Sequence, residues 1–170
     1  MKIYFGTDHA GFELKEQLVP FVRDELGHEV EDLGAHEYNE EDDYPDLIAP
    51  VARKVSESAL RQAQGEHDLG IVLGGSGQGE AIVANRFPHV RAVVINDAVG
   101  SRKEAGEPNE VALSREHNQA NVLSLGARFL NNDEAKKVVK DWLETPAESE
   151  PRHLRRLQKI EEVTKHLHSN

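Results

Sequence analysis

In "DLGIVLGGSGQGEAIVANR", residues 68–86, an apolar run, a glycine-rich turn and a helical pattern follow one another without a gap. The apolar run shows no alternation with polar residues, which is typical of a strand buried on both faces of a parallel sheet. After the turn, apolar residues recur at the three- and four-residue spacing of a helix. A strand that leads directly into a helix in this way indicates an α/β protein.

The same alternation continues on both sides of this stretch. Strands are predicted at residues 2–6, 28–34, 68–74, 90–96 and 120–126, and helices at residues 11–26, 46–64, 80–86, 110–118, 133–144 and 152–168. Strands separated by helix-length segments favour a parallel sheet with right-handed crossovers. Pro20 is expected to kink or end the first helix. With no internal repeat, residues 1–170 are predicted to form one domain.

The composition of the 170-residue chain excludes several classes of protein. A formal net charge of -11 disfavours nucleic acid and anionic membrane as partners. The absence of cysteine excludes disulfides, thiolate catalysis and cysteine-based zinc sites. No apolar run reaches the roughly 18 residues of a membrane helix, and the N-terminus shows no signal-peptide pattern. A cytoplasmic protein is therefore expected.

The last helix is set apart by a loose linker, "TPAESEP", at residues 145–151. We expect this helix, at about residues 151–167, to pack away from its own sheet and against a partner subunit. It carries Arg152, Arg155 and Arg156 on one helix face. A charge run usually marks a solvated face. In a chain this acidic, however, clustered guanidinium groups favour an anion site, because their planar forks suit phosphate.

The glycine-rich turn departs from three common motifs. A P-loop needs a lysine after its last glycine, where this chain has Glu80. A dinucleotide fingerprint places its third glycine differently from Gly79, and Gln78 breaks the pattern of a nucleophile elbow. Four glycines within residues 74–79 nevertheless exceed the needs of a tight turn, because glycines let backbone amides approach a ligand closely.

Amides exposed at a helix N-terminus attract negative charge. Ser76 adds a hydroxyl, and Glu80 in the first helical turn is either a partner of the helix dipole or a catalytic base. A nest of amides beside a carboxylate suits removal of a proton next to a carbonyl, because the developing enediolate oxygen needs donors already in place. Together with the arginine cluster, these residues indicate a metal-free isomerase of a phosphorylated sugar.

Polar residues also follow two other predicted strands. Asp8 and His9 come after the first strand, and Asn96 and Asp97 come after the fourth. In open α/β sheets ligands bind at the carboxyl ends of the strands. The turns after the first and third strands are therefore expected to converge on one crevice, provided that these strands are neighbours.

The chain resembles the type B ribose-5-phosphate isomerases, which are grouped with the galactose-6-phosphate isomerase subunits. The matching segments are "GTDHAGFELK", "DDYPD", "GIVLGGSGQGEAIVANR", "VRAVV", "SREHNQANVLSLGAR" and "RHLRR", in family order from residue 3 to about residue 160. The resemblance implies a Rossmann-like three-layer α/β/α fold with a five-stranded parallel sheet. It also implies a homodimer or a dimer of dimers, with active sites at the subunit interface. The implied reaction interconverts D-ribose 5-phosphate and D-ribulose 5-phosphate without a metal or other cofactor.

The resemblance also implies roles for single residues. Catalysis would involve Asp8 near the ring hydroxyls, His117 in ring opening, and Glu80 with Ser76 at the enediolate. The anion hole, the phosphate site and the other substrate contacts would be made by His9, Gly75, Gly77, Gly79, Asn118, Arg128, Arg152 and Arg156. Of these residues, His117 and Asn118 are expected to reach into the site of the neighbouring subunit. Arg155 has no counterpart and is expected on the surface.

Two departures from the family pattern are informative. One branch of the family uses a cysteine base where this chain has Gly74, and the other carries a glutamate at the position of Glu80. Since the chain has no cysteine, Glu80 is the expected base. The segment "GSRKEAGEPNE", residues 100–110, is longer than the usual connection and is expected to reshape the pocket rim.

Three functions remain compatible with the sequence. The first is ribose-5-phosphate isomerase, and the second is an isomerase of allose 6-phosphate, galactose 6-phosphate or a tetrose phosphate. The third is a non-catalytic nucleotide- or sugar-phosphate-binding module, in which Asp97 would imitate a ribose-binding acid. The misplaced third glycine and the charge of Glu80 argue against this module. The acidic pair Asp42 and Asp43 is interpreted as a solvated loop rather than a cation site.

Overall fold

The sheet of this protein consists of parallel strands. The computed structural model describes residues 1–61, 67–97, 109–147 and 150–165. Its strands are β1 (Lys2–Thr7), β2 (Glu29–Asp32), β3 (Leu69–Gly74), β4 (Ala92–Ile95) and β5 (Val122–Gly126). They lie in the order β2-β1-β3-β5-β4, with every neighbouring pair parallel. This confirms the five-stranded parallel sheet, with β3 at its centre.

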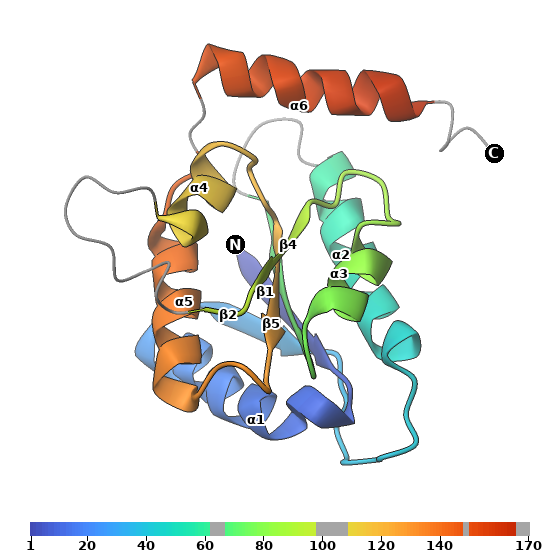
Figure 1. Cartoon of the computed structure of the whole chain (residues 1–170), viewed down its shortest axis with the longest axis vertical. Coiled ribbons are helices and arrows are strands. Elements are labelled where there is room, and N and C mark those ends of the chain that lie inside the picture. Colours follow the sequence, from blue (N-terminus) through green and yellow to red (C-terminus); the bar gives the residue numbers. More distant parts are fainter. Residues whose placement is uncertain (62–66, 98–108, 148–149, 166–170) are drawn as a thin grey trace.

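Helices cover both faces of the sheet (Figure 1). The helices of the described residues are η1 (His9–Gly11), α1 (Phe12–Pro20), η2 (Phe21–Glu25), α2 (Tyr44–Arg61), α3 (Gln78–Ala84), α4 (Glu110–Glu116), α5 (Asn132–Glu144) and α6 (Pro151–Thr164). One face carries α1, α4 and α5, and the other carries α2 and α3. The expected three-layer α/β/α architecture is confirmed.

Apolar side chains fill both spaces between the sheet and its helices. Successive residues of a strand point to opposite faces, so Ile71 and Leu73 pack toward α1 and α5, whereas Val72 packs toward α2. All residues of β3 are buried, which explains why this strand shows no polar alternation. On the first side, Trp142 of α5 is fully buried, and the guanidinium carbon of Arg115 lies 4.9 Å from the centre of its ring.

The first helix changes its geometry at the proline expected to kink or end it. α1 ends at Pro20, and the chain continues as the π-helical turn η2. The amide of Leu26 donates to the carbonyl of Phe21 at 3.1 Å, a bond that spans five residues. Because proline has no amide hydrogen, it leaves the regular ladder of the helix incomplete at this point.

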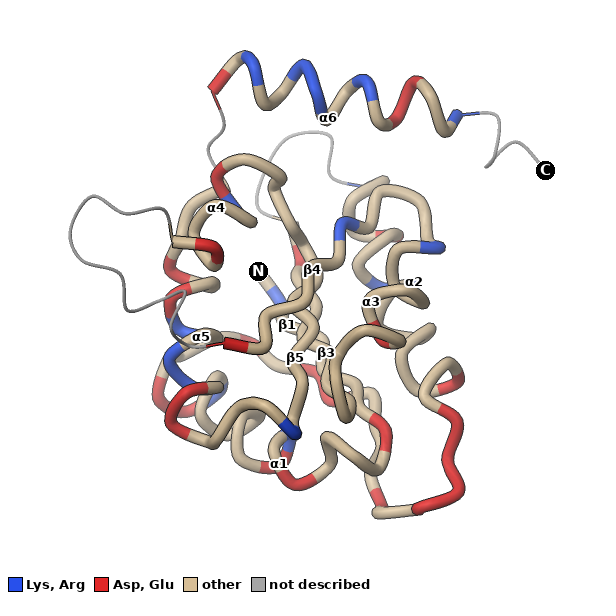
Figure 2. Tube along the Cα trace, viewed as in Figure 1, with Lys and Arg blue, Asp and Glu red and all other residues tan. Residues whose placement is uncertain are grey.

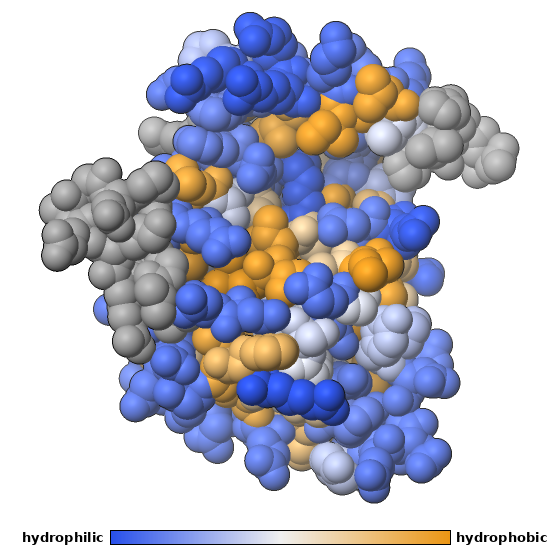
Figure 3. All heavy atoms as spheres, in the orientation of Figure 1, coloured by the Kyte–Doolittle hydropathy of each residue, from blue (hydrophilic) through white to orange (hydrophobic). Residues whose placement is uncertain are grey.

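The last helix stands apart from the three layers, beyond the amino ends of the strands (Figure 1). Its side chains Leu154, Ile160 and Val163 are 39%, 50% and 59% exposed. Figure 3 shows apolar side chains on α6 and on the domain face beneath it. Figure 2 shows basic residues along α6 and acidic residues on the loop before α2, so the charge of the chain is unevenly distributed. Packing of α6 on a partner subunit stays a prediction.

Part of the chain lies outside the described residues. This part includes residues 100–108, which form most of the segment that we expect to reshape the pocket rim. In the regions that are described, no helix combines the length and the apolar character needed to cross a membrane.

Leu123 on β5 provides a test of the core. Its side chain is fully buried, so Leu123→Ala should lower the free energy of unfolding by about 2–5 kcal/mol through lost apolar burial and a residual cavity. Leu60 on α2 is 62% exposed, and Leu60→Ala should change this free energy by less than about 0.5 kcal/mol. Denaturant titration measures both values, and equal losses would contradict the assigned core.

Candidate active site

The carboxyl ends of the strands bring several predicted site residues to one edge of the sheet. Asp8 follows β1, the glycine-rich turn follows β3, and Arg128 follows β5. Because β1, β3 and β5 are neighbours in the sheet, the segments that follow them are adjacent. The expected convergence of the first and third turns is confirmed. The hydroxyl of Thr7 also ties the two strand ends together, donating to the carbonyl of Leu73 at 3.1 Å.

The glycine-rich turn caps the N-terminus of α3. Gly77 is the N-cap residue, and its φ of 74° is a left-handed conformation that glycine adopts without strain. The amides of Ala127 and Arg128, which follow β5, donate to the carbonyls of Gly74 and Gly75 at 2.8 and 3.2 Å. The turn is therefore held against the end of β5, with the first amides of α3 beside it.

Glu80 lies in the first turn of α3 with its side chain almost completely buried. It is 4% exposed, and its carboxylate lies so close to Gly74 that a Cβ atom at residue 74 would overlap it. Burial raises the pKa of Glu80, and the negative charge of Asp8 acts in the same direction, while a hydrogen bond from its own backbone amide opposes both. A carboxylate with a raised pKa is a suitable proton acceptor near neutral pH.

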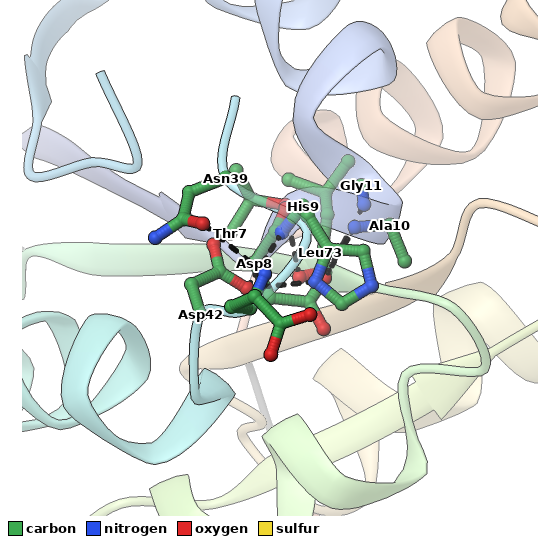
Figure 4. A network of polar contacts seen from close by, with 9 residues as sticks. Thr7, Asp8, His9, Ala10, Gly11, Asn39, Asp42 and Leu73 are labelled. Carbon is green, nitrogen blue, oxygen red and sulfur yellow. Dashed lines mark hydrogen bonds and ion pairs between the residues drawn. The ribbon is translucent and has the colours of Figure 1, made fainter. Parts of the chain in front are cut away.

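Asp8 and His9 form a polar network with the loop before α2 (Figure 4). Asp8 is buried and accepts hydrogen bonds from the amides of Ala10 and Gly11 at 3.0 and 3.3 Å. The imidazole Nδ1 of His9 lies 2.7 Å from Oδ1 of Asp42. This hydrogen bond is the main cause of the raised pKa of His9, and it favours the charged imidazolium.

Arg128 supplies positive charge at the same edge. Its guanidinium lies directly over Gly75, since a Cβ atom built there would be 3.0 Å from the guanidinium carbon. The side chain is exposed and near enough to His9 to lower the pKa of that histidine slightly against the effect of Asp42. The Arg128 guanidinium thus adjoins the glycine-rich turn at the same edge as His9.

Four other predicted site residues lie at the opposite edge of the sheet. His117 and Asn118 precede β5, and Arg152 and Arg156 belong to α6, beyond the amino ends of the strands (Figure 1). Within one chain they do not meet Glu80. Arg155 is exposed on α6, as expected.

A pair of stacked histidines organises this amino edge. The rings of His117 and His153 are 4.0 Å apart and nearly parallel, beside a hollow of about 290 Å³ that Glu116, Pro146 and Glu150 also line. The Nε of Arg152 donates to Nε2 of His153 at 3.1 Å. The pKa of His153 is lowered, first by burial and then by the positive charges of its neighbours, so the neutral ring is favoured.

Three of the described residues bring metal-ligating atoms close together. These atoms of Asp8, His9 and Asp42 lie within 4.8 Å of one another. Protein hydrogen bonds already engage Asp8 and join His9 to Asp42, as described above. The group is of a composition that could hold a divalent cation; among the described residues, Oδ2 of Asp42 is buried without a hydrogen-bond partner, while the other contacts of the group are made within the protein.

Sequence reasoning missed two contributors, one at each edge of the sheet. Asp42 was interpreted as part of a solvated loop, but its side chain is only 11% exposed and binds His9. His153, which was given no role from the sequence, is buried and stacks on His117. Neither contact has a signal in the local pattern, because each joins residues more than 30 positions apart.

The fold and the site define the class of the protein as an isomerase built on an α/β sheet, and comparison with known proteins agrees. Residues 3–160 match the family described as Ribose/Galactose Isomerase, and the chain belongs to this family. It is 38% identical to ribose-5-phosphate isomerase B of Mycolicibacterium paratuberculosis, over 95% of this chain and 91% of that protein. It is 40% identical to ribose-5-phosphate isomerase B of Escherichia coli, over 94% of this chain and 93% of that protein.

Solved structures show the same similarity. The crystal structure of ribose-5-phosphate isomerase B from Mycoplasma genitalium with bound ribulose-5-phosphate matches with a TM-score of 0.82 and 32% identity, covering 96% of both chains. Ribose-5-phosphate isomerase B from Clostridium thermocellum matches with a TM-score of 0.81 and 38% identity, covering 98% of this chain and 99% of the other. The protein is therefore an isomerase by family, and its fold matches that of these solved isomerase structures.

The charge of Asp8 should be measurable in the pKa of Glu80. Asp8→Asn removes this charge and retains a capping side chain, so the pKa of Glu80 should fall, as followed by NMR of ¹³C-labelled glutamate carboxyls. Asp24→Asn, which alters an exposed aspartate paired with Arg23, should leave it unchanged. Because the pKa of Glu80 is raised in the native state, the native state binds this proton more tightly than the unfolded chain does. The contribution of Glu80 to the free energy of unfolding should therefore fall as pH rises from the unfolded-state pKa of Glu80 to its native-state pKa. An unchanged pKa in Asp8→Asn would contradict the described geometry.

Proposed function

We propose that this protein interconverts D-ribose 5-phosphate and D-ribulose 5-phosphate through an enediolate, without a metal, and that Glu80 is the base. The observation that carries the proposal is the buried carboxylate of Glu80 beside the glycine-rich turn at the N-terminus of α3. The bound ribulose-5-phosphate in the Mycoplasma genitalium relative supports the choice of sugar. The family description, which includes galactose, keeps a six-carbon sugar phosphate as the alternative substrate.

In the proposed reaction Glu80 removes the proton from C2 of the open-chain aldose. The electron pair of the C2–H bond forms the C1–C2 double bond, and the charge moves to the oxygen on C1. Amides and the Ser76 hydroxyl at the glycine-rich turn would stabilise this oxygen, because donors fixed in advance need no reorganisation as charge develops. Return of the proton from Glu80 to C1, together with transfer of the C2 hydroxyl proton to the oxygen on C1, gives the ketose.

The other predicted residues take roles that follow their position. Asp8 lies near Glu80 and is proposed to serve the ring hydroxyls, while His9 and Arg128 are proposed to bind the phosphate. His9 is suited to this role because Asp42 favours its charged form. A phosphate between two cationic groups would orient the sugar over the glycine-rich turn.

The residues at the amino edge are proposed to complete the site of a second copy. His117 would act in ring opening, Asn118 would contact the sugar, and Arg152 and Arg156 would bind the phosphate of the neighbour. This proposal of a homodimer, or a dimer of dimers, is supported by the position of these residues at the edge opposite Glu80. The exposed apolar side chains of α6 also support it, because such side chains are commonly covered at protein interfaces.

The direct test is an isomerase assay with chelator-treated protein and D-ribose 5-phosphate. Glu80→Gln should reduce kcat by at least about 10²-fold, because it removes the general base and keeps the side-chain shape. Glu16→Gln, an exposed glutamate on α1, is the matched control and should keep full activity. Undiminished turnover in Glu80→Gln would move the base elsewhere. Absent turnover in the wild type would shift the proposal to six-carbon and four-carbon sugar phosphates.

A mixing experiment tests whether two chains share a site. Glu80→Gln and His117→Ala should each be inactive alone. In a mixed dimer one of the two sites would keep both native residues. Unfolding and refolding the two variants together should therefore give mixed dimers, each with up to about half the activity of a wild-type dimer. Inactive mixtures that nevertheless contain mixed dimers, shown by mass spectrometry of differently tagged chains, would contradict a shared site.

A further inference from the structure

The carbonyl groups of the glycine-rich turn are held in two different ways. Backbone amides after β5 hold the carbonyls of Gly74 and Gly75, as described above. Side chains bind the next two carbonyls: Nδ2 of Asn96 donates to the carbonyl of Ser76 at 2.8 Å, and the hydroxyl of Ser124 donates at 2.6 Å to the carbonyl of Gly77, which also accepts from the amide of Ala81 at 3.1 Å. These two donors come from separate strands, since Asn96 follows β4 and Ser124 lies within β5.

Fixing a carbonyl also fixes the amide of the same peptide. In a planar trans peptide the C=O and the N–H point in opposite directions. The carbonyl of Ser76, held toward Asn96, therefore turns the Gly77 amide away from β4. The carbonyl of Gly77 accepts from Ser124, and the Gln78 amide on the other side of that peptide donates to Oγ of Ser76 at 3.3 Å. Asn96 thus determines how the Gly77 amide is aimed, and Ser124 helps to fix the Gln78 amide that holds the Ser76 hydroxyl.

Asn96 occupies its position at a cost to stability. Its Oδ1 is buried, and within the described residues it has no hydrogen-bond partner. The side chain fits only because residue 126 is glycine: a Cβ atom there would overlap Oδ1 and would lie 2.9 Å from the carbonyl oxygen of Ser76. An unsatisfied buried acceptor destabilises a fold, so an apolar side chain would serve better if packing were the only requirement.

We propose that Asn96 and Ser124 are positioning residues, which hold the carbonyl side of the glycine-rich turn. Asn96 thereby aims the Gly77 amide at the developing enediolate oxygen, and Ser124 supports the Gln78 amide in its hydrogen bond to Ser76, whose hydroxyl is the second donor to that oxygen. This inference rests on the proposed function. A positioning role differs from a purely structural role in one measurable respect. The positioned hydrogen-bond donors stabilise the charged intermediate far more than the neutral sugar. Phosphate binding, which uses other groups, should therefore be unaffected.

The test compares Asn96→Leu, Ser124→Ala and the wild type in kcat, KM and the binding of two inhibitors. One inhibitor is a phosphorylated hydroxamate that mimics the enediolate, and the other is a phosphorylated sugar alcohol that mimics the neutral open chain. Each variant should lose about tenfold or more in kcat and a similar factor in hydroxamate affinity. KM and the affinity for the sugar alcohol should change by less than about twofold.

Asn85→Leu is the matched control. The Asn85 side chain also binds backbone groups of another segment, but these belong to the start of β4, at the end of the strand opposite Asn96. Its Nδ2 donates to the carbonyl of Ala92 at 3.0 Å, and its Oδ1 accepts from the Ala92 amide at 2.8 Å. This variant should lower the unfolding temperature without a selective loss of hydroxamate binding. Should Asn96→Leu fail to fold, Ser124→Ala, which deletes only a hydroxyl, still tests the inference.

The outcomes separate the inference from the proposed function. Equal losses for both inhibitors, or no loss for either, in variants of an active wild type would overturn the inference alone. Absence of turnover with every sugar phosphate in the wild type would overturn the proposed function and the inference with it. A selective loss for the hydroxamate, absent in Asn85→Leu, would support both.

Discussion

The burial of one carboxylate, that of Glu80, is the constraint on which the rest of the carboxyl edge depends. A buried carboxylate resists ionisation, and this raises its pKa. It also demands space at the end of the central strand, which Gly74 provides by having no side chain. The turn that follows must then reach the start of α3 within a few residues, and this requires the left-handed conformation of Gly77. Strand end, turn and helix start are thus coupled through a single side chain.

The second constraint is the parallel sheet itself, which separates the predicted site residues into two sets. His9 and Arg128 follow strands, whereas His117, Arg152 and Arg156 precede a strand or lie on α6. A histidine lies at each edge, and the surroundings shift the two pKa values in opposite directions. Asp42 favours the charged form of His9, while burial and positive neighbours favour the neutral form of His153. The same residue type is thus tuned toward proton binding at one edge and toward a neutral, hydrogen-bond-accepting ring at the other.

The sequence predicts the parts of this molecule that depend on local pattern and chain order. The uninterrupted apolar run of β3 and the glycines after it placed Glu80 and the turn, and the order of strands placed Asp8 beside them once β1 and β3 proved to be neighbours. Contacts between distant segments were not predictable. Asn96 and Ser76 are 20 residues apart, and Gly77 and Ser124 are 47 apart, so no periodicity reports their hydrogen bonds. The role of His117 came from family resemblance, whereas an anion site at the α6 arginines was also indicated by their clustering on one helix face.

The contact between Gly74 and Glu80 restricts how such a site can change during evolution. A thiol at residue 74, as in one branch of the family that the chain resembles, would occupy the volume that the Glu80 carboxylate now fills. A thiol and the carboxylate would therefore compete for one volume, and the end of the Glu80 side chain would have to shift to admit a side chain at residue 74. With Glu80 as the proposed base, substitution of Gly74 displaces that base, and substitution of Glu80 removes it. Exchange of one base for the other thus involves both positions.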